Sequence, residues 1–124
     1  MKRSVELARP AGSPLSVEVT SAGGRRPAVL LCGTPRGLAA RLARAGFAVV
    51  SVDCRTPDDV GLVLDALKRG ALSIEGGERV AVVAADEANG RAAAERGVPW
   101  RVAPGAADER SVETVVQWLA RQLV

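Results

Sequence analysis

The sequence contains no histidine among its 124 residues. This absence excludes Ser-His-Asp and Cys-His catalytic sites and every metal site that uses an imidazole, because no other side chain has an unperturbed pKa near neutrality. Tyrosine is absent too, and there is one phenylalanine, so a platform for stacking nucleic-acid bases is nearly excluded. We therefore expect no metal, no cofactor and no nucleic-acid partner.

Long apolar runs are also missing. No run approaches the ~18 residues that a membrane-spanning helix needs. The charged start, residues 1–6, is followed by no apolar region typical of a secretory signal. Two cysteines are too few for a disulfide scaffold and fit a reducing compartment. We expect a cytoplasmic protein with no membrane partner.

The remaining composition is that of an ordinary globular protein. Hydrophobic residues make up 48% of the chain and charged residues 25%, which favours a packed core over disorder. The net charge of +3 comes mostly from scattered arginines, a pattern typical of a solvated surface. The length predicts a single domain over residues 1–124.

Strand and helix patterns alternate along the chain after an opening pair of strands. Residues 4–8 and 15–19 alternate apolar and polar side chains around a turn, which predicts an antiparallel pair. Buried strands are predicted at residues 28–32, 47–52, 80–84 and 99–103, with helices after each of them. One of these helices is expected to begin at Thr56 and Pro57, with Thr56 as its N-cap.

This alternation predicts an α/β fold. We expect a three-layer sandwich with a mainly parallel sheet of about six strands and an antiparallel N-terminal edge. In such sheets ligands bind beyond the carboxyl ends of the strands. A small-molecule ligand is therefore expected at the segments that follow the buried strands, residues 33–37, 53–56, 85–89 and 104–108.

The turn at residues 33–37 has two interpretations. It follows a strand and opens a helix, so its amides are placed to cradle a phosphate or another anion. However, it matches neither common phosphate-binding pattern, and Pro35 removes one amide donor. The alternative is a plain turn that requires glycine.

The two cysteines also leave two interpretations open. Cys32 and Cys54 each follow a strand, and the two strands are candidates for neighbours. A thiolate phosphatase needs an arginine six positions after its cysteine, and Leu38 and Val60 stand there instead. One interpretation is that both cysteines are small buried hydrophobic residues. The other is that one of them is a thiolate, favoured by a helix N-terminus.

Asp86 stands where a buried strand turns into a helix, between the small residues Ala84 and Ala88. This is the steric pattern of a nucleophile elbow, whose central residue has a strained backbone. Aspartate tolerates positive φ better than most residues. The alternative is an aspartate that caps the helix N-terminus.

In their order these segments follow a known arrangement. Residues 26–33 match a strand ending in a His-Gly oxyanion motif, with Cys32 in place of histidine, and residues 53–56 match an Asp-x-Arg-Gly turn, with Thr56 in place of glycine. Residues 79–90 match the elbow, and residues 98–108 match the strand and loop that carry a triad acid. The chain thus resembles the α/β-hydrolase superfamily, particularly its small dienelactone-hydrolase-like and esterase members, without a cap.

The resemblance implies roles for individual residues. The serine of G-x-S-x-G falls on Asp86 and the triad acid on Asp108, while the triad histidine has no counterpart. An aspartate nucleophile would need Glu87 or Asp108 as base, and the amides near Thr34 and Glu87 as oxyanion hole. The ligand-binding candidates at the same edge are Gly33, Ala85 and Cys54.

A chain that lacks the family's nucleophile, base and cap is expected to bind rather than to catalyse. We therefore predict a degenerate, non-catalytic α/β-hydrolase-like protein that acts in ligand or protein binding. One alternative is a weak ester hydrolase with Asp86 as nucleophile, and another is an anion- or nucleotide-binding domain. Uncovered edges of the sheet favour a homo-oligomer, with Trp118 either exposed for that contact or packed on the sheet.

Overall fold

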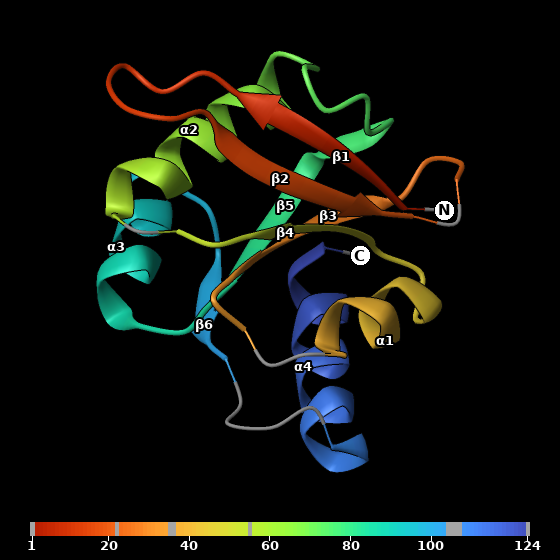
Figure 1. Cartoon of the computed structure of the whole chain (residues 1–124). Helices are drawn as coiled ribbons and strands as arrows, with labels where there is room; N and C mark the ends of the chain where they lie inside the picture. The colour runs from red at the N-terminus through yellow and green to blue at the C-terminus, as the bar shows by residue number, and fades with distance from the viewer. Residues whose placement is uncertain (1, 22, 35–36, 55, 104–107, 124) are drawn as a thin grey trace.

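The computed structural model describes residues 2–21, 23–34, 37–54, 56–103 and 108–123. These residues form one six-stranded sheet in the order β1-β2-β4-β3-β5-β6, with four helices around it (Figure 1). The strands are β1 Lys2–Leu7, β2 Leu15–Thr20, β3 Pro27–Cys32, β4 Ala48–Val52, β5 Gly76–Ala84 and β6 Trp100–Val102. The helices are α1 Leu38–Arg44, α2 Pro57–Lys68, α3 Glu87–Glu95 and α4 Glu109–Leu123.

The sheet is parallel except at its N-terminal edge. Strands β4, β3, β5 and β6 pair in parallel, whereas β2 runs antiparallel to both β1 and β4. In the opening hairpin Val5 lies opposite Val17, and Val19 of β2 lies opposite Val50 of β4. The predicted mixed sheet with an antiparallel edge is confirmed.

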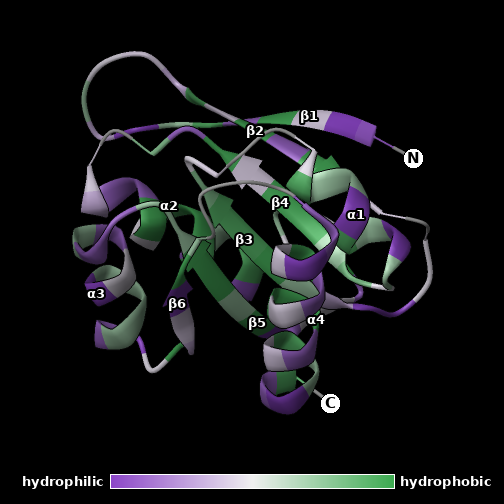
Figure 2. Ribbon diagram, turned by 90° about the horizontal axis from the view of Figure 1, so that it is seen from below, coloured by the Kyte–Doolittle hydropathy of each residue, from purple (hydrophilic) through white to green (hydrophobic). Residues whose placement is uncertain are grey.

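Helices cover both faces of the sheet and give the predicted three layers. α2 and α3 lie on one face and α1 and α4 on the other (Figure 1). Because successive side chains of a strand point to opposite faces, Leu30 and Val50 pack towards α2, while Val29 and Val49 pack towards α1 and α4. Figure 2 shows the resulting apolar central strands and the polar outer sides of the helices.

Helix α2 begins where the sequence predicts. Thr56 is its N-cap, Pro57 occupies the first turn, and Asp58 and Asp59 follow there, which suits the positive end of the helix dipole. The Thr56 hydroxyl makes no capping hydrogen bond, so this start depends on Pro57 and the acids. Helix α1 ends just before Gly46, whose φ of 106° belongs to the left-handed region that glycine favours.

Strand β5 is longer than predicted. It begins at Gly76, where it pairs with Pro27 across a register shift, and not at Val80. Gly76 approaches the backbone of Arg26 so closely that a Cβ would overlap it. The prediction missed this start because Gly76 to Arg79 carry no apolar pattern. The start of β5 is set by its pairing with β3, which lies far away in the sequence.

Candidate functional site

The turns after β3, β4 and β5 meet at the carboxyl edge of the sheet. The Ala85 amide donates to the carbonyl of Cys32 at 2.9 Å, and the Gly33 amide donates to the carbonyl of Val52 at 3.3 Å. A Cβ on Gly33 would stand 3.3 Å from the Cβ of Ala85, and the Sγ atoms of Cys54 and Cys32 are 3.1 Å apart. The structure therefore brings together the three predicted ligand residues, Gly33, Ala85 and Cys54. Residues 35, 36, 55 and 104–107 of the predicted segments lie outside the described residues.

Asp86 caps α3 and does not form a strained elbow. Its φ of −137° and ψ of 165° are extended backbone. The Asn89 amide donates to Oδ1 of Asp86 at 2.9 Å, and Nδ2 of Asn89 donates to Oδ2 at 3.2 Å. The prediction of a strained elbow backbone at Asp86 is wrong, and the alternative, that Asp86 caps the helix, is confirmed. A carboxylate oxygen that satisfies an amide of the first turn needs no unusual backbone.

The two predicted bases have other partners. Glu87 is exposed and forms an ion pair with Arg91 at 2.9 Å, one turn along α3. Oδ1 of Asp108 accepts a hydrogen bond from the Ser111 amide at 2.8 Å. The hydrogen bonds from Ser111, and after them the backbone hydrogen bond from Arg110 and the charge of Arg41, hold the pKa of Asp108 below its ordinary value. A lowered pKa weakens a carboxylate as a general base near neutral pH.

A groove opens at the carboxyl ends of β3 and β4, on the α1 side of the sheet. Its volume is about 590 Å³, within the usual range for small-molecule sites. Predicted residues Gly33 and Thr34 line it. Side chains from the antiparallel edge and β4 complete the polar part of the wall: Lys2, Glu18, Thr20, Ser51 and Asp53.

The polar wall of this groove was missed by the sequence analysis. Nζ of Lys2 lies 3.3 Å from Oε1 of Glu18. Oγ1 of Thr20 is buried, and no polar group of the described residues is within hydrogen-bonding distance of it. The alternation in residues 15–20 signals that Glu18 and Thr20 share a face. The position of Glu18 opposite Ser51, and of Thr20 opposite Val49, depends on the pairing of β2 with β4.

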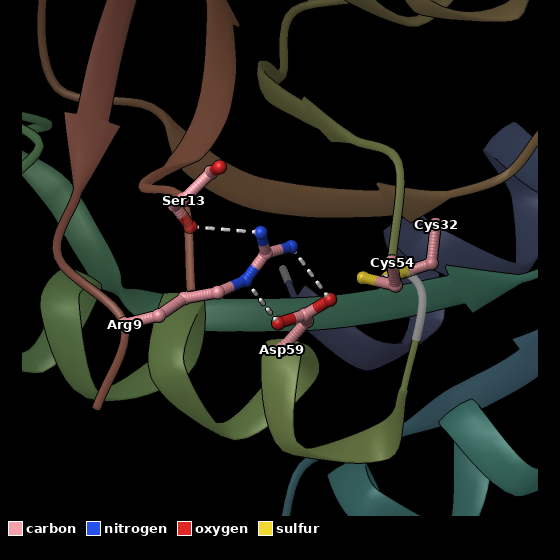
Figure 3. A network of polar contacts seen from close by, with 5 residues as sticks. All are labelled: Arg9, Ser13, Cys32, Cys54 and Asp59. Atoms are coloured by element: carbon pink, nitrogen blue, oxygen red, sulfur yellow. Dashed lines mark hydrogen bonds and ion pairs between the residues drawn. The ribbon is translucent and has the colours of Figure 1, made fainter. Parts of the chain in front are cut away.

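A charged and sulfur-containing cluster lies at the same edge, on the α2 side (Figure 3). The guanidinium of Arg9 binds both carboxylate oxygens of Asp59, and it donates to the carbonyl of Ser13 at 3.0 Å. Cys32 is fully buried and Cys54 is half-buried. The interpretation of Cys32 as a small buried hydrophobe is confirmed, although its thiol also contacts Cys54.

A second cavity of about 860 Å³ lies at the opposite edge of the sheet. Its walls come from the ends of α2, α3 and α4 and from the start of β5. Because ligands of parallel sheets bind beyond the carboxyl ends of the strands, the groove by β3 and β4 is the stronger candidate site.

Trp118 packs on the sheet, as one of the two interpretations predicts. It is half-buried against the apolar cluster under α1 and α4. The guanidinium carbon of Arg101, on β6, lies 5.9 Å from the centre of its ring, within reach of a cation–π contact. Val102, also on β6, has 51% of its surface exposed. Among the described residues it is the large hydrophobic side chain that lies open to solvent.

Further predictions concern the surroundings of the protein. Within the described ranges, no helix is both long enough and apolar enough to cross a membrane. In the same residues no three side chains of His, Cys, Asp or Glu gather as metal ligands. The cytoplasmic location, the homo-oligomer and the expected lack of a cofactor or nucleic-acid partner stay predictions.

Comparison with known proteins decides the fold. No protein-family model matches the sequence, and no curated protein matches it. Solved esterase structures do match. The esterase of Pyrobaculum calidifontis has 23% identity and a TM-score of 0.55, over 98% of this chain and 56% of its own. The chain has the α/β-hydrolase fold.

Two further esterases agree with this α/β-hydrolase fold. The thermostable carboxylesterase EstE1, from a metagenomic library, has 20% identity and a TM-score of 0.57, over 100% of this chain and 59% of its own. The esterase LipW of Mycobacterium marinum has 18% identity and a TM-score of 0.58, over 99% of this chain and 54% of its own. The chain thus spans little more than half the length of these esterases. The resemblance inferred from the order of segments is confirmed at the level of fold.

Proposed function

We propose that this α/β-hydrolase-fold chain binds a small polar molecule in the groove at the carboxyl ends of β3 and β4, and does not hydrolyse esters. The observation that carries the proposal is the groove itself. It has a volume suited to a small ligand, and it lies at the edge where parallel sheets bind ligands.

The groove's side chains favour a neutral ligand rich in hydroxyl groups. Its charged pair, Lys2 and Glu18, is already matched within the wall, and the carboxylate of Asp53 accepts hydrogen bonds from ligand hydroxyl groups. The hydroxyls of Thr20, Thr34 and Ser51 both donate and accept hydrogen bonds. An unpaired buried hydroxyl, as at Thr20, costs free energy, and a ligand hydroxyl would recover it once the Thr20 side chain turns this hydroxyl into the groove.

The residues at the fold's catalytic positions argue against hydrolysis. The chain has no histidine, and Asp86 holds both carboxylate oxygens in hydrogen bonds to Asn89. Hydrolysis through an aspartyl ester also needs a base that activates water. Glu87 is ion-paired with Arg91, and the pKa of Asp108 is lowered, so neither is arranged for that role.

A hydrolysis assay tests the catalytic half of the proposal. The purified chain and Asp86→Asn are incubated with p-nitrophenyl acetate and p-nitrophenyl butyrate, with Asp58→Asn as a control on the first turn of α2. We expect no turnover above the buffer rate in any of the three. Turnover by the wild type and by Asp58→Asn that disappears in Asp86→Asn would establish the weak ester hydrolase instead. Because asparagine also caps helices, Asp86→Asn is expected to fold normally.

A binding assay tests the other half. Amide resonances of the labelled chain are followed while glycerol, glucose, inorganic phosphate and ATP are added separately. We expect saturable shifts at Gly33 and Gly37 with a neutral hydroxylated compound, and the loss of these shifts in Thr20→Val, which keeps the shape of the side chain. Saturable shifts with phosphate or ATP alone would favour the anion-binding alternative. If no compound gives saturable shifts at the groove, the proposed ligand class is wrong.

A further inference from the structure

The two cysteines of the chain form one site, although 22 positions separate them. The Sγ atom of Cys54 lies 3.1 Å from that of Cys32. Cys32 ends β3, and Cys54 follows β4, the parallel neighbour of β3. A disulfide needs an S–S distance of about 2.05 Å, so a shift of about 1 Å closes the bond. The half-buried Cys54 side chain, beyond the end of its strand, is the one placed to make that shift.

The two thiols differ in access. Cys32 is fully buried among the apolar residues under α2, whereas Cys54 is half-buried and meets solvent. The hydrogen bond with Cys54, then burial and the nearby charges of Cys54, Asp86 and Asp59, raise the pKa of Cys32 well above its usual range. An external reagent therefore reaches Cys54 first, and Cys32 reacts only with what forms on Cys54.

An ion pair lies beside the accessible thiol (Figure 3). The guanidinium of Arg9 is held in place by both oxygens of Asp59 and by the carbonyl of Ser13 (Figure 3). The hydrogen bond to Asp59 is the largest influence that raises the pKa of Arg9, and the charge of Cys54 acts on it in the same direction. The paired charges of Arg9 and Asp59 therefore both lie within electrostatic range of the two thiols. The thiolate is the nucleophile in thiol–disulfide exchange, so the accessible Cys54 makes the first attack.

From this geometry we propose that Cys32 and Cys54 form a redox-reactive dithiol, which low-molecular-weight disulfides oxidise to an intramolecular disulfide. Cys54 loses its proton, and its thiolate attacks one sulfur of the small disulfide, whose own S–S bond breaks to release one small thiol. Cys32 then loses its proton and attacks the Cys54 sulfur of the mixed disulfide, which releases the second small thiol. The protein loses two electrons and two protons, and one small disulfide becomes two thiols.

The new bond would join two turns of the candidate site. It would close a ring over residues 32–54, which contains α1 and β4. The neighbours of the two cysteines, Gly33 and Asp53, line the groove. The redox site itself depends on the contact between the two thiols, so the proposal does not require that the groove binds a ligand.

Oxidised glutathione tests the proposal on the whole folded chain. The reduced protein is incubated with it, and intact mass and free thiols are measured after quenching with acid. We expect the loss of both free thiols, a mass lower by two hydrogen atoms and a monomer on a non-reducing gel. Two thiols that stay free, a retained glutathionyl group on the wild type, or a disulfide-linked dimer would each overturn the proposal.

Single variants test the order of attack. Cys32→Ala is expected to stop at one stable glutathionyl adduct, because no second thiol resolves it. Cys54→Ala is expected to keep Cys32 free while the protein is folded. Reaction of Cys32 in that variant at the rate of Cys54 would contradict the assigned order. Since the mass change of the wild type needs no variant, poor folding of either variant does not remove the test.

A melting measurement supplies an independent readout. The oxidised wild type is expected to melt roughly 5–15 °C above the reduced form, because a ring of this size constrains the unfolded chain. Cys32→Ala treated in the same way should show no such rise. A lower melting temperature for the oxidised wild type would show that the fold does not accommodate the bond, and it would overturn the proposal.

Discussion

Both carboxylate oxygens of Asp59, on the first turn of α2, accept hydrogen bonds from the guanidinium of Arg9 at 3.1 Å each (Figure 3). The two side chains are 7% and 16% exposed. The pair joins the loop after β1 to a helix 50 residues further along the chain. Because the geometry is bidentate and shielded from water, this pair fastens the antiparallel edge to the α2 face.

We expect Arg9→Leu to lower the melting temperature clearly, because the substitution removes two charge-assisted hydrogen bonds that the buried carboxylate of Asp59 accepts. The matched control is Arg25→Leu, which breaks the exposed ion pair with Glu78 and should change the melting temperature little. The double variant Arg9→Leu/Asp59→Leu should recover much of the loss. Equal effects of the two single variants would show that the Arg9 pair is no more important than a surface pair.

Two helical glycines make a matched test of close packing. In α3, a Cβ on Gly90 would overlap the ring of Trp100 on β6, whereas in α2 the atoms nearest to a Cβ on Gly61 belong to the guanidinium of Arg96. We expect Gly90→Ala to lower the free energy of unfolding by about 1–3 kcal/mol, the usual cost of overpacking. Gly61→Ala should be neutral or stabilising, since the Arg96 side chain moves aside and alanine favours the helix.

Urea denaturation measures both changes. Gly90→Ala combined with Trp100→Leu should recover part of the loss, because the smaller side chain makes room for the new methyl group. If Gly90→Ala alone is as stable as the wild type, α3 and β6 do not pack as closely as described.

Asp86 is expected to act as a helix cap in stability measurements. Asp86→Ala should lower the free energy of unfolding by ~1 kcal/mol, because the Asn89 amide loses its acceptor. Asp86→Ser should keep most of that stability, since a serine hydroxyl also caps helices. Chemical denaturation of the three proteins provides the comparison. An equal loss in both variants would contradict a role through capping alone.

Asp108 gives the unfolding free energy a dependence on acid pH. Its pKa is lowered in the folded state by the hydrogen bonds from Ser111, so the folded state favours the charged carboxylate. The stabilisation is therefore present above the unfolded pKa of ~3.9 and is lost as pH falls through the lower folded pKa. In Asp108→Asn, which keeps a capping group, the melting temperature should fall less steeply below about pH 4 than in the wild type. Identical slopes in the two proteins would contradict the prediction.

Much of the fold follows from local patterns in the sequence. Continuous apolar runs such as residues 28–32 predict strands buried on both faces, and Pro57 with its following acids predicts the start of α2. The alternation of strands and helices predicts the three layers and places the candidate site at the strand ends. The predicted ligand residues Gly33, Ala85 and Cys54 do converge there. These features depend on periodicity and on the steric preferences of single residues, which act over a few positions.

Other features required the tertiary structure. The sequence pattern at Asp86 suits an elbow as well as a cap, and only the position of Asn89 distinguishes them. The groove wall needs β2 beside β4, which brings Thr20 and Glu18 to the same side as Ser51. The contact between Arg9 and Asp59 likewise joins segments that no local pattern relates.

The sequence by itself determined that these 124 residues contain no imidazole side chain and that they build a layered α/β sheet, because composition and periodicity are properties of the chain alone. The tertiary structure decided which strands became neighbours, and with them the groove by β4, the cap at Asp86 and the thiol pair. Strand pairing is chosen by the burial of whole faces against distant segments, so its consequences appear only when the complete sheet is formed.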